Sequence, residues 1–217
     1  MKSIKARTAK TRRVRGRKAN KGGRSKRRRA PASKAKPRDI WVFGYGSLMW
    51  DPGFPHAEVV PALLRGYHRA LCIYSRFHRG TLERPGLVLG LDRGGACRGR
   101  AFRVEGSSAR AILGYLDERE LVSYAYRRQK VSIVLPSGNV PAFAYVADRA
   151  HSQYAGNPGV ARSVELVAQG VGVSGTCFDY LESAVKHLDG LGIEDGPLHD
   201  LLARVIERLR QSMAFDV

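Results

Sequence analysis

The first 38 residues of this 217-residue chain contain no acidic and no aromatic residue. They hold 18 of the 38 lysines and arginines, which leaves 20 basic residues against 19 acidic ones in the rest of the chain. The net charge of +19 therefore belongs to residues 1–38, and residues 39–217 are near neutral. A segment with so few large apolar side chains cannot bury enough surface to offset its chain entropy, so we expect a disordered basic tail over residues 1–38.

The basic tail has several possible roles. Arg27, Arg28 and Arg29 would neutralise phosphate backbones in a non-specific, salt-sensitive way. The lack of aromatic residues removes the base stacking on which single-strand recognition depends. The alternatives are a solubility arm, translation from a start codon placed too far upstream, and an organellar presequence, although a lysine-rich run without apolar spacing makes a poor amphipathic helix. Non-specific nucleic acid is therefore one possible partner among several interpretations.

Cysteines are few, and long apolar runs are absent. Cys72, Cys97 and Cys177 lie far apart and never in C-x-x-C spacing, so we expect neither a disulfide framework nor a structural zinc site. The six histidines show no metal-ligand spacing. No run approaches the roughly 18 apolar residues of a membrane-crossing helix, and no apolar segment of a signal peptide follows the basic start. These features favour a cytoplasmic protein that makes no membrane contact.

Residues 39–217 are long enough for one domain with a hydrophobic core. Runs rich in β-branched and aromatic residues predict strands at 40–43, 70–74, 86–91, 99–104, 130–135 and 142–147. The turn residues Pro136–Asn139 join the last two strands into a predicted hairpin. Helical periodicity appears at 107–119, 158–171, 175–190 and 197–212. Strands dominate the first half and helices the second, so the predicted class is α+β.

A glycine-rich loop, Gly44-Tyr45-Gly46-Ser47-Leu48, follows the first predicted strand. Glycines permit tight turns in which successive N–H groups point at one anion. The run is neither a dinucleotide fingerprint nor a P-loop, because Met49 replaces the third glycine and no Gly-Lys-Ser/Thr follows. Nor does it have the glycines two residues either side of the serine that define a nucleophile elbow. By itself the loop is either a plain turn or an anion cradle.

One acidic residue falls on the apolar side of the first predicted helix. At about 100° per residue, Ile112 and Leu116 share one stripe, and Glu120 lies about 40° from Leu116. A carboxylate in that place is either paired with a cation or has a pKa raised by desolvation, as a general base near neutrality requires. The alternative is a frayed helix end with Glu120 in water or paired with Arg127 or Arg128.

Several short blocks together resemble the ChaC family of glutathione-specific γ-glutamylcyclotransferases. They run in order from about Trp41 to the last predicted helix. The blocks are Val42-Phe43-Gly44-Tyr45-Gly46-Ser47-Leu48 with Trp50, Tyr74-Ser75-Arg76, Arg79-Gly80-Thr81, Arg84-Pro85-Gly86, Leu116-Asp117, Arg119-Glu120, Tyr154-Ala155-Gly156-Asn157-Pro158 and Gly172-Val173-Ser174-Gly175. Two segments depart from the family pattern, Leu121–Tyr124 and Phe77-His78, and both bear on fine substrate preference.

The resemblance implies a γ-glutamylcyclotransferase-like mixed β-barrel surrounded by helices, with no metal or cofactor. It implies that residues 39–217 form the catalytic domain and that Glu120 moves the proton when glutathione cyclises to 5-oxoproline and Cys-Gly. Arg76 is a candidate partner for a substrate carboxylate, with a structural salt bridge as the alternative, and Tyr154 is a candidate hydroxyl contact. The candidate substrate-binding residues are Val42, Phe43, Gly44, Tyr45, Gly46, Ser47, Leu48, Arg76 and Tyr154.

Three other functions compete with this one. A hydrolase would use Ser47 as nucleophile with His78 or His151 as base, although no motif fixes such a geometry. The substrate of the same fold could be another γ-glutamyl amine or peptide. A nucleic-acid-associated basic protein with an inactive domain is the alternative from a different functional class.

Overall fold

The computed structural model describes residues 37–215. The predicted basic tail, residues 1–38, therefore lies almost entirely outside the described residues. No helix within the described range combines the length and the apolar character needed to cross a membrane.

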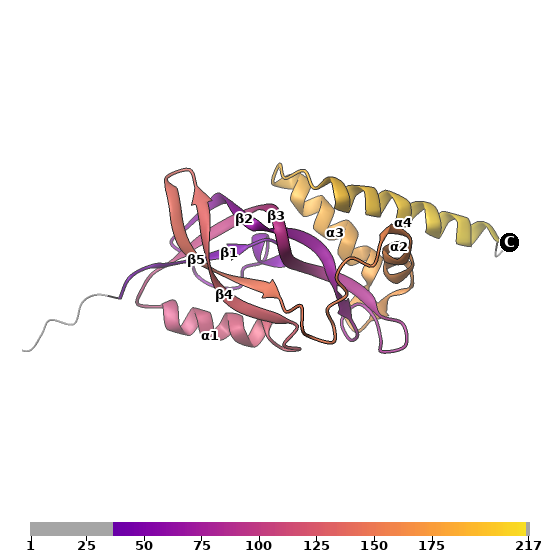
Figure 1. Ribbon diagram of the computed structural model, residues 1–217, viewed down its shortest axis with the longest axis horizontal. Coiled ribbons are helices and arrows are strands. Elements are labelled where there is room, and N and C mark those ends of the chain that lie inside the picture. The colour runs from indigo at the N-terminus through magenta and orange to yellow at the C-terminus, as the bar shows by residue number, and fades with distance from the viewer. Residues whose placement is uncertain (1–36, 216–217) are drawn as a thin grey trace, which may run out of the picture. The chain divides into compact units, whose positions relative to one another are not determined.

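Five strands close into a barrel in the order β1-β3-β2-β4-β5 (Figure 1). Neighbouring strands are antiparallel except β1 and β5, which pair in parallel at Val42 and Phe143, so the barrel is mixed. The strands are β1 (Ile40–Gly44), β2 (Glu58–Ser75), β3 (Gly86–Val104), β4 (Tyr126–Leu135) and β5 (Gly138–Ala147). This architecture confirms the predicted α+β class and the mixed barrel.

The strands β2 and β3 are much longer than predicted, at 18 and 19 residues. The predicted strand 70–74 is only the end of β2, and the predicted strands 86–91 and 99–104 are two parts of β3. The prediction of two separate strands here was wrong, because β3 is continuous. Gly94 and Gly95 adopt positive φ angles of 103° and 66° while the strand continues. Glycines inside a strand allow such local bends without ending the pairing.

The predicted hairpin between β4 and β5 is confirmed. Leu135 pairs with Gly138, so only Pro136 and Ser137 lie between the strands. Gly138 has a φ of 121°, a conformation that favours glycine. The turn chemistry of Pro, Ser and Gly therefore fixes the register of the last two strands.

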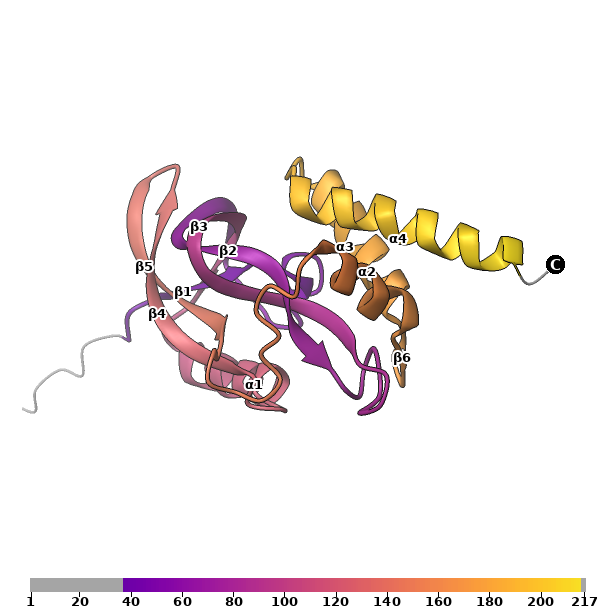
Figure 2. The ribbon, with the colours of Figure 1, turned by 45° about the vertical axis from the view of Figure 1, so that its right-hand side comes forward.

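The four predicted helices are present, each within a few residues of its expected range. They are α1 (Ala109–Glu120), α2 (Val160–Gln169), α3 (Cys177–Gly190) and α4 (Gly196–Phe215). A short 3-10 helix, η1 (Ser47–Met49), and a two-residue hairpin of β6 (Val171–Gly172) and β7 (Gly175–Thr176) were not predicted. Figure 2 shows α2, α3 and α4 gathered beside one end of the barrel, while α1 lies apart from them along the strands.

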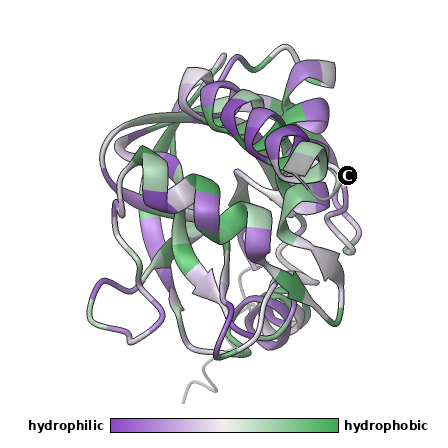
Figure 3. Ribbon diagram, turned by 90° about the vertical axis from the view of Figure 1, so that its right-hand side faces the viewer, coloured by the Kyte–Doolittle hydropathy of each residue, from purple (hydrophilic) through white to green (hydrophobic). Residues whose placement is uncertain are grey.

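The apolar residues form one large cluster and two smaller ones. The large cluster joins the inside of the barrel to α2, α3 and α4. Helix α1 buries Ile112 and Leu116 against Val42 and Phe102 in a second cluster. Hydrophilic and hydrophobic positions alternate along α4, as expected for a helix with one face on the core (Figure 3). Because Val42 belongs to β1, the packing of Ile112 and Leu116 fixes α1 against the strand that leads into the glycine-rich loop.

The three cysteines are free and buried. Burial raises the pKa of Cys72 to about 12 and that of Cys97 and Cys177 to about 11. Because the thiolate is the reactive form, we predict that the native chain reacts slowly with Ellman's reagent at pH 8. Three thiols should titrate only after denaturation, and rapid reaction of all three in the native chain would contradict this packing.

Candidate active site

The glycine-rich loop leaves β1 at Gly44 and turns at once into η1. Its own hydrogen bonds run from Met49 N–H to the Gly46 carbonyl (2.9 Å) and from Asp51 N–H to the Ser47 carbonyl (2.8 Å). Among the hydrogen bonds of residues 37–215, none is donated by the backbone N–H of Gly46 or Ser47. Two adjacent N–H groups therefore lack a protein acceptor among these residues, as the anion-cradle interpretation of the loop requires.

Three arginines from three different elements hold backbone carbonyl groups of this loop and of the turn that follows it. Arg69 belongs to β2, Arg100 to β3 and Arg119 to α1. The contacts are Arg69 Nε to the Tyr45 carbonyl (2.5 Å), Arg100 Nη1 to the Met49 carbonyl (2.8 Å) and Arg119 Nη1 to the Asp51 carbonyl (2.9 Å). Because charged donors make the stronger hydrogen bonds, the loop is fixed from its carbonyl side. No sequence pattern pointed to a role for any of these arginines.

Glu120 is the last residue of α1, and its side chain is only 19% exposed. One of its oxygens, Oε1, lies 3.3 Å from Arg119 Nε, while Arg119 Nη2 donates to Ser47 Oγ at 3.2 Å. A single guanidinium thus connects the carboxylate to the glycine-rich loop. Burial raises the pKa of Glu120, and the neighbouring Arg119 opposes that rise. A partly buried carboxylate of this kind is a stronger base than an exposed one.

The alternative environment considered for Glu120 was wrong. Arg128 pairs with Asp117 at 2.5 Å, and Arg127 lies 3.3 Å from Asp148. Neither arginine is therefore the partner of Glu120. A frayed helix end in water is also excluded by the low exposure of its side chain.

Three tyrosines lie close enough to Glu120 for its negative charge to raise their pKa values. They are Tyr45, Tyr126 and Tyr180, and burial is the main cause of the rise in each. The Tyr126 hydroxyl donates to the Leu89 carbonyl at 2.7 Å, and the Leu89 N–H donates to the Tyr180 hydroxyl at 3.1 Å. The carboxylate therefore has neutral phenols as neighbours. Tyr126 and Tyr180 could not be found from sequence, because they are single residues on distant elements.

A hollow of about 500 Å³ opens beside the end of α1. Leu121, Tyr124 and Tyr126 are among its lining residues, and Glu120 is not. Tyr126 lines this hollow and is also close enough to Glu120 for the carboxylate charge to raise its pKa. Tyr124 has a φ of 56°, which is unusual for a residue other than glycine.

Four of the predicted substrate-binding residues contribute buried side chains to the core, and one of them, Tyr45, is 6% exposed and lies in the large cluster. Val42 and Phe43 are fully buried, and Leu48 is 4% exposed. Val42 and Leu48 belong to the cluster under α1, whereas Phe43 faces the large cluster inside the barrel. The side chains of Val42, Phe43 and Leu48 are therefore occupied by core packing, which leaves only their backbone for contact with a substrate.

The structure does not bring Arg76 or Tyr154 into hydrogen-bonding contact with the loop or with Glu120. Arg76 Nη2 donates to the Ser152 carbonyl at 3.2 Å, and no described carboxylate pairs with it. The Tyr154 hydroxyl donates to Asp92 Oδ2 at 2.7 Å. Burial and this hydrogen bond raise the pKa of Tyr154 to about 12.

The hydrolase alternative lacks its base among the described residues. Ser47 Oγ accepts from Arg119, whereas His78 Nδ1 lies 3.0 Å from Ser174 Oγ. His151 Nδ1 accepts from the backbone N–H of Gln153 at 3.2 Å. Neither histidine is in place to activate the Ser47 hydroxyl.

Sequence comparisons relate most of the chain to proteins of one kind. A family model described as ChaC-like protein matches residues 40–208. The glutathione-specific γ-glutamylcyclotransferase of Escherichia coli strain K12 is 34% identical over 174 residues, which are 80% of this chain and 75% of that protein. The Schizosaccharomyces pombe protein of the same name is 31% identical over 198 residues and covers 80% of this chain and 95% of its own length.

Solved structures show the same fold. The crystal structure of a γ-glutamylcyclotransferase specific to glutathione from yeast superposes with a TM-score of 0.70 at 22% sequence identity. The superposition covers 78% of this chain and 96% of the yeast chain. From the match over residues 40–208 and from relatives more than 30% identical, the chain belongs to the ChaC-like protein family.

Proposed function

We propose that this chain is a glutathione-specific γ-glutamylcyclotransferase that releases 5-oxoproline and Cys-Gly, with Glu120 as the acid/base residue. The observation that carries the proposal is the position of Glu120, which is partly buried and joined through Arg119 to the glycine-rich loop. The names of the relatives from Escherichia coli and Schizosaccharomyces pombe support the reaction and the substrate.

The proposed reaction needs little covalent chemistry from the protein. In glutathione the α-amino nitrogen and the γ-carbonyl carbon belong to the same glutamyl unit. Attack of that nitrogen forms a five-membered lactam and breaks the amide bond to Cys-Gly, so neither water nor a covalent intermediate with the enzyme is required. The main task is to hold the γ-glutamyl chain in the attacking conformer.

Glu120 is the proposed proton carrier. Its carboxylate removes a proton from the α-ammonium group, which frees the lone pair for attack. The protonated side chain then delivers that proton to the departing Cys-Gly nitrogen, while the new ring nitrogen loses its second proton to solvent, so the lactam is neutral and the carboxylate is regenerated in each cycle. The raised pKa of Glu120 suits both transfers, because it brings the carboxyl closer to the pH at which the enzyme works.

The loop supplies the proposed anion contacts. The N–H groups of Gly46 and Ser47 would donate to the α-carboxylate of the substrate or to the oxyanion that forms at the γ-carbonyl. The arginines on the carbonyl side of the loop hold these donors in place before substrate arrives. Arg76 and Tyr154 stay proposed substrate contacts, which would require the substrate to extend beyond the loop.

A product assay tests the proposed function. The full chain is incubated with glutathione and, separately, with γ-glutamyl-alanine, and 5-oxoproline is quantified together with the released amine. The proposal expects fast release from glutathione and little from γ-glutamyl-alanine. The reverse preference would assign the chain to another γ-glutamyl substrate, and no release from either would refute the activity.

We place the reaction in the cytoplasm, because free buried cysteines are typical of a reducing compartment. We propose that the basic segment 1–38 binds nucleic acid non-specifically and takes no part in catalysis. A chain that lacks residues 1–38 should keep its cyclisation rate and lose any salt-sensitive retention on DNA or RNA. Loss of cyclisation in that variant would contradict the proposed domain boundary.

Arg119 gives a prediction for pH dependence. Removing its charge by Arg119→Gln removes the opposition to the burial effect, so the pKa of Glu120 should rise further. Because the deprotonated carboxylate accepts the first proton, the acidic limb of kcat/KM should move to higher pH. The profile is measured by 5-oxoproline release in wild type, Arg119→Gln and the exposed control Arg110→Gln on the same helix. An acidic limb that stays in place or moves to lower pH would count against Glu120 as the base.

A further inference from the structure

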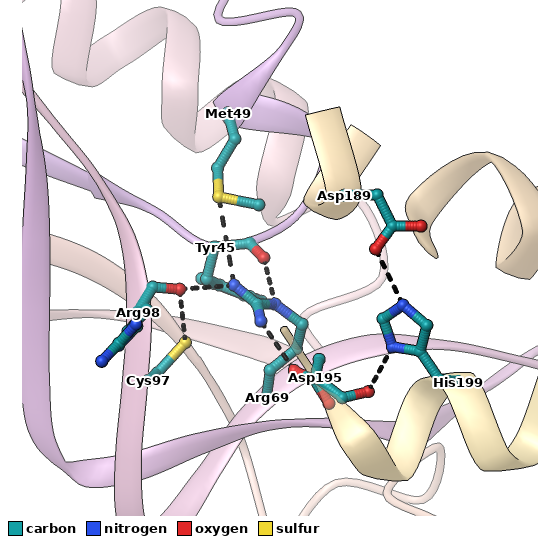
Figure 4. Close-up of polar contacts among 8 residues, drawn as sticks. All are labelled: Tyr45, Met49, Arg69, Cys97, Arg98, Asp189, Asp195 and His199. Atoms are coloured by element: carbon teal, nitrogen blue, oxygen red, sulfur yellow. Dashed lines mark hydrogen bonds and ion pairs between the residues drawn. The ribbon is translucent and has the colours of Figure 1, made fainter. Parts of the chain in front are cut away.

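Arg69 is a buried cation whose side chain is only 2% exposed. All three of its nitrogens make contacts, and Nη2 also lies 4.0 Å from Met49 Sδ (Figure 4), while the three contacts with oxygen lead to three different segments. These are Nε to the Tyr45 carbonyl (2.5 Å), Nη1 to Asp195 Oδ2 (2.7 Å) and Nη2 to the Arg98 carbonyl (2.6 Å). A buried guanidinium with this complete set of partners links the loop, the barrel and the helices beside it.

Asp195 neutralises this charge from the connection between α3 and α4. Its side chain is 13% exposed, and the segment that carries it is held by His199. The Asp195 carbonyl lies 2.7 Å from His199 Nδ1, and Asp189 Oδ1 lies 2.8 Å from His199 Nε2. The hydrogen bonds to Asp195 and Asp189 raise the pKa of His199 and favour its doubly protonated form, which donates to both. The anion that faces Arg69 is therefore itself fixed.

The contact with Tyr45 has a geometric consequence for the next residue. The Tyr45 carbonyl and the Gly46 N–H belong to one peptide unit, which is trans because no described peptide bond is cis. In a planar trans peptide the C=O and the N–H point in opposite directions. Holding the carbonyl on Arg69 therefore aims the Gly46 N–H away from Arg69, and that N–H donates to no described group.

We propose that Arg69 is a positioning residue: it fixes the Tyr45–Gly46 peptide so that the Gly46 N–H points at the substrate anion. This inference rests on the proposed function and deepens it, because it names the residue that orients the loop donor. Arg69 acts through the loop and not by contact with the reacting atoms. The ion pair with Asp195 stabilises the fold, whereas the orientation of the loop depends on the hydrogen bond from Arg69 Nε to the Tyr45 carbonyl.

Two variants separate orientation from stability. Arg69→Lys keeps a positive charge opposite Asp195, but a single ammonium nitrogen cannot reach all three separated acceptors of the guanidinium. Asp195→Asn removes the ion pair while Arg69 Nε remains free to hold the Tyr45 carbonyl. We expect Arg69→Lys to lower kcat/KM for glutathione by about 100-fold through a misplaced donor, and Asp195→Asn to stay within about threefold of wild type.

Urea denaturation of both variants distinguishes a positioning role from a purely structural one. A purely structural role predicts that the loss of activity follows the loss of stability. Activities are measured at a temperature at which both variants are fully folded. We expect Asp195→Asn to lose at least as much stability as Arg69→Lys although it keeps its activity. If the activity losses follow the stability losses in both variants, or if Arg69→Lys is as active as wild type, the positioning role is overturned.

Amide hydrogen exchange tests the inference without any use of activity. The N–H groups of Met49 and Asp51 close the turn after Tyr45 and report how firmly the loop is held. Arg69→Lys should speed their exchange about tenfold or more, and Asp195→Asn should leave it within about twofold of wild type. Unchanged exchange in Arg69→Lys would refute the positioning role even in an active enzyme. An inactive wild type with this exchange pattern would refute the proposed function alone.

Discussion

Glu120→Gln is expected to lower kcat for 5-oxoproline release from glutathione by about 10²- to 10⁴-fold, the range usual for loss of a general acid/base. Glutamine keeps the shape of the side chain but cannot accept the proton of the α-ammonium group. Binding of glutathione through the loop should change little, so the loss should appear in kcat more than in KM. The rate is measured by chromatography of 5-oxoproline under saturating glutathione.

The controls for this variant are Glu118→Gln on the exposed side of α1 and Glu83→Gln on an exposed loop, and both should keep most of the activity. The stability of Glu120→Gln also carries information. Because burial raises the pKa of Glu120 above about 4.5, the folded wild type holds the Glu120 proton more tightly than the unfolded chain does. The free energy of unfolding therefore falls as the pH rises from about 4.5 through the raised pKa. The glutamine variant should therefore be at least as stable as wild type at neutral pH. Near-normal turnover would remove Glu120 from the mechanism.

Gly99→Ala should reduce kcat/KM by about 100-fold and destabilise the fold by about 1–3 kcal/mol. A Cβ at Gly99 would lie 2.3 Å from the Gly44 carbonyl oxygen and 2.8 Å from the ring of Phe43. The first of these atoms is backbone, so the end of β1 must move away from β3. Because the loop begins at Gly44, that movement displaces the donors of Gly46 and Ser47.

The matched control for Gly99→Ala is Gly114→Ala on α1. A Cβ there meets no heavy atom within 4 Å, and alanine favours helix over glycine, so the control should stabilise the chain by about 0.5–1 kcal/mol. Its activity should equal that of wild type. Kinetics and urea denaturation of both variants check the prediction, and a fully active Gly99→Ala would show that the end of β1 tolerates displacement.

The part of the site that could be predicted from sequence is the part with a local pattern. Glu120 was found because it continues an apolar stripe of one helix, and the structure places it next to the loop that the glycines indicated. The four helices were also predicted, since apolar periodicity marks each of them over a length of 10 to 20 residues. Patterns of this kind depend on residues close together in the chain.

The rest depends on residues brought together only by folding. Arg69 was missed although it stands in an alternating strand pattern, because the predicted strand began one residue later, at Ala70. The true strand extends back to Glu58, past Gly66 with its φ of 83°. No local sequence pattern marks Arg100 or Tyr180. Their roles depend on hydrogen bonds with Met49 and Leu89, which lie on other elements.

The most direct test of intramolecular ring closure is whether oxygen from solvent enters the product. Glutathione is incubated with the full-length enzyme in ¹⁸O-labelled water, and the products are analysed by mass spectrometry. Intramolecular attack predicts unlabelled 5-oxoproline in equal amount to Cys-Gly. Glutamate that carries ¹⁸O as the main initial product would show that water is the nucleophile and would contradict the cyclisation mechanism.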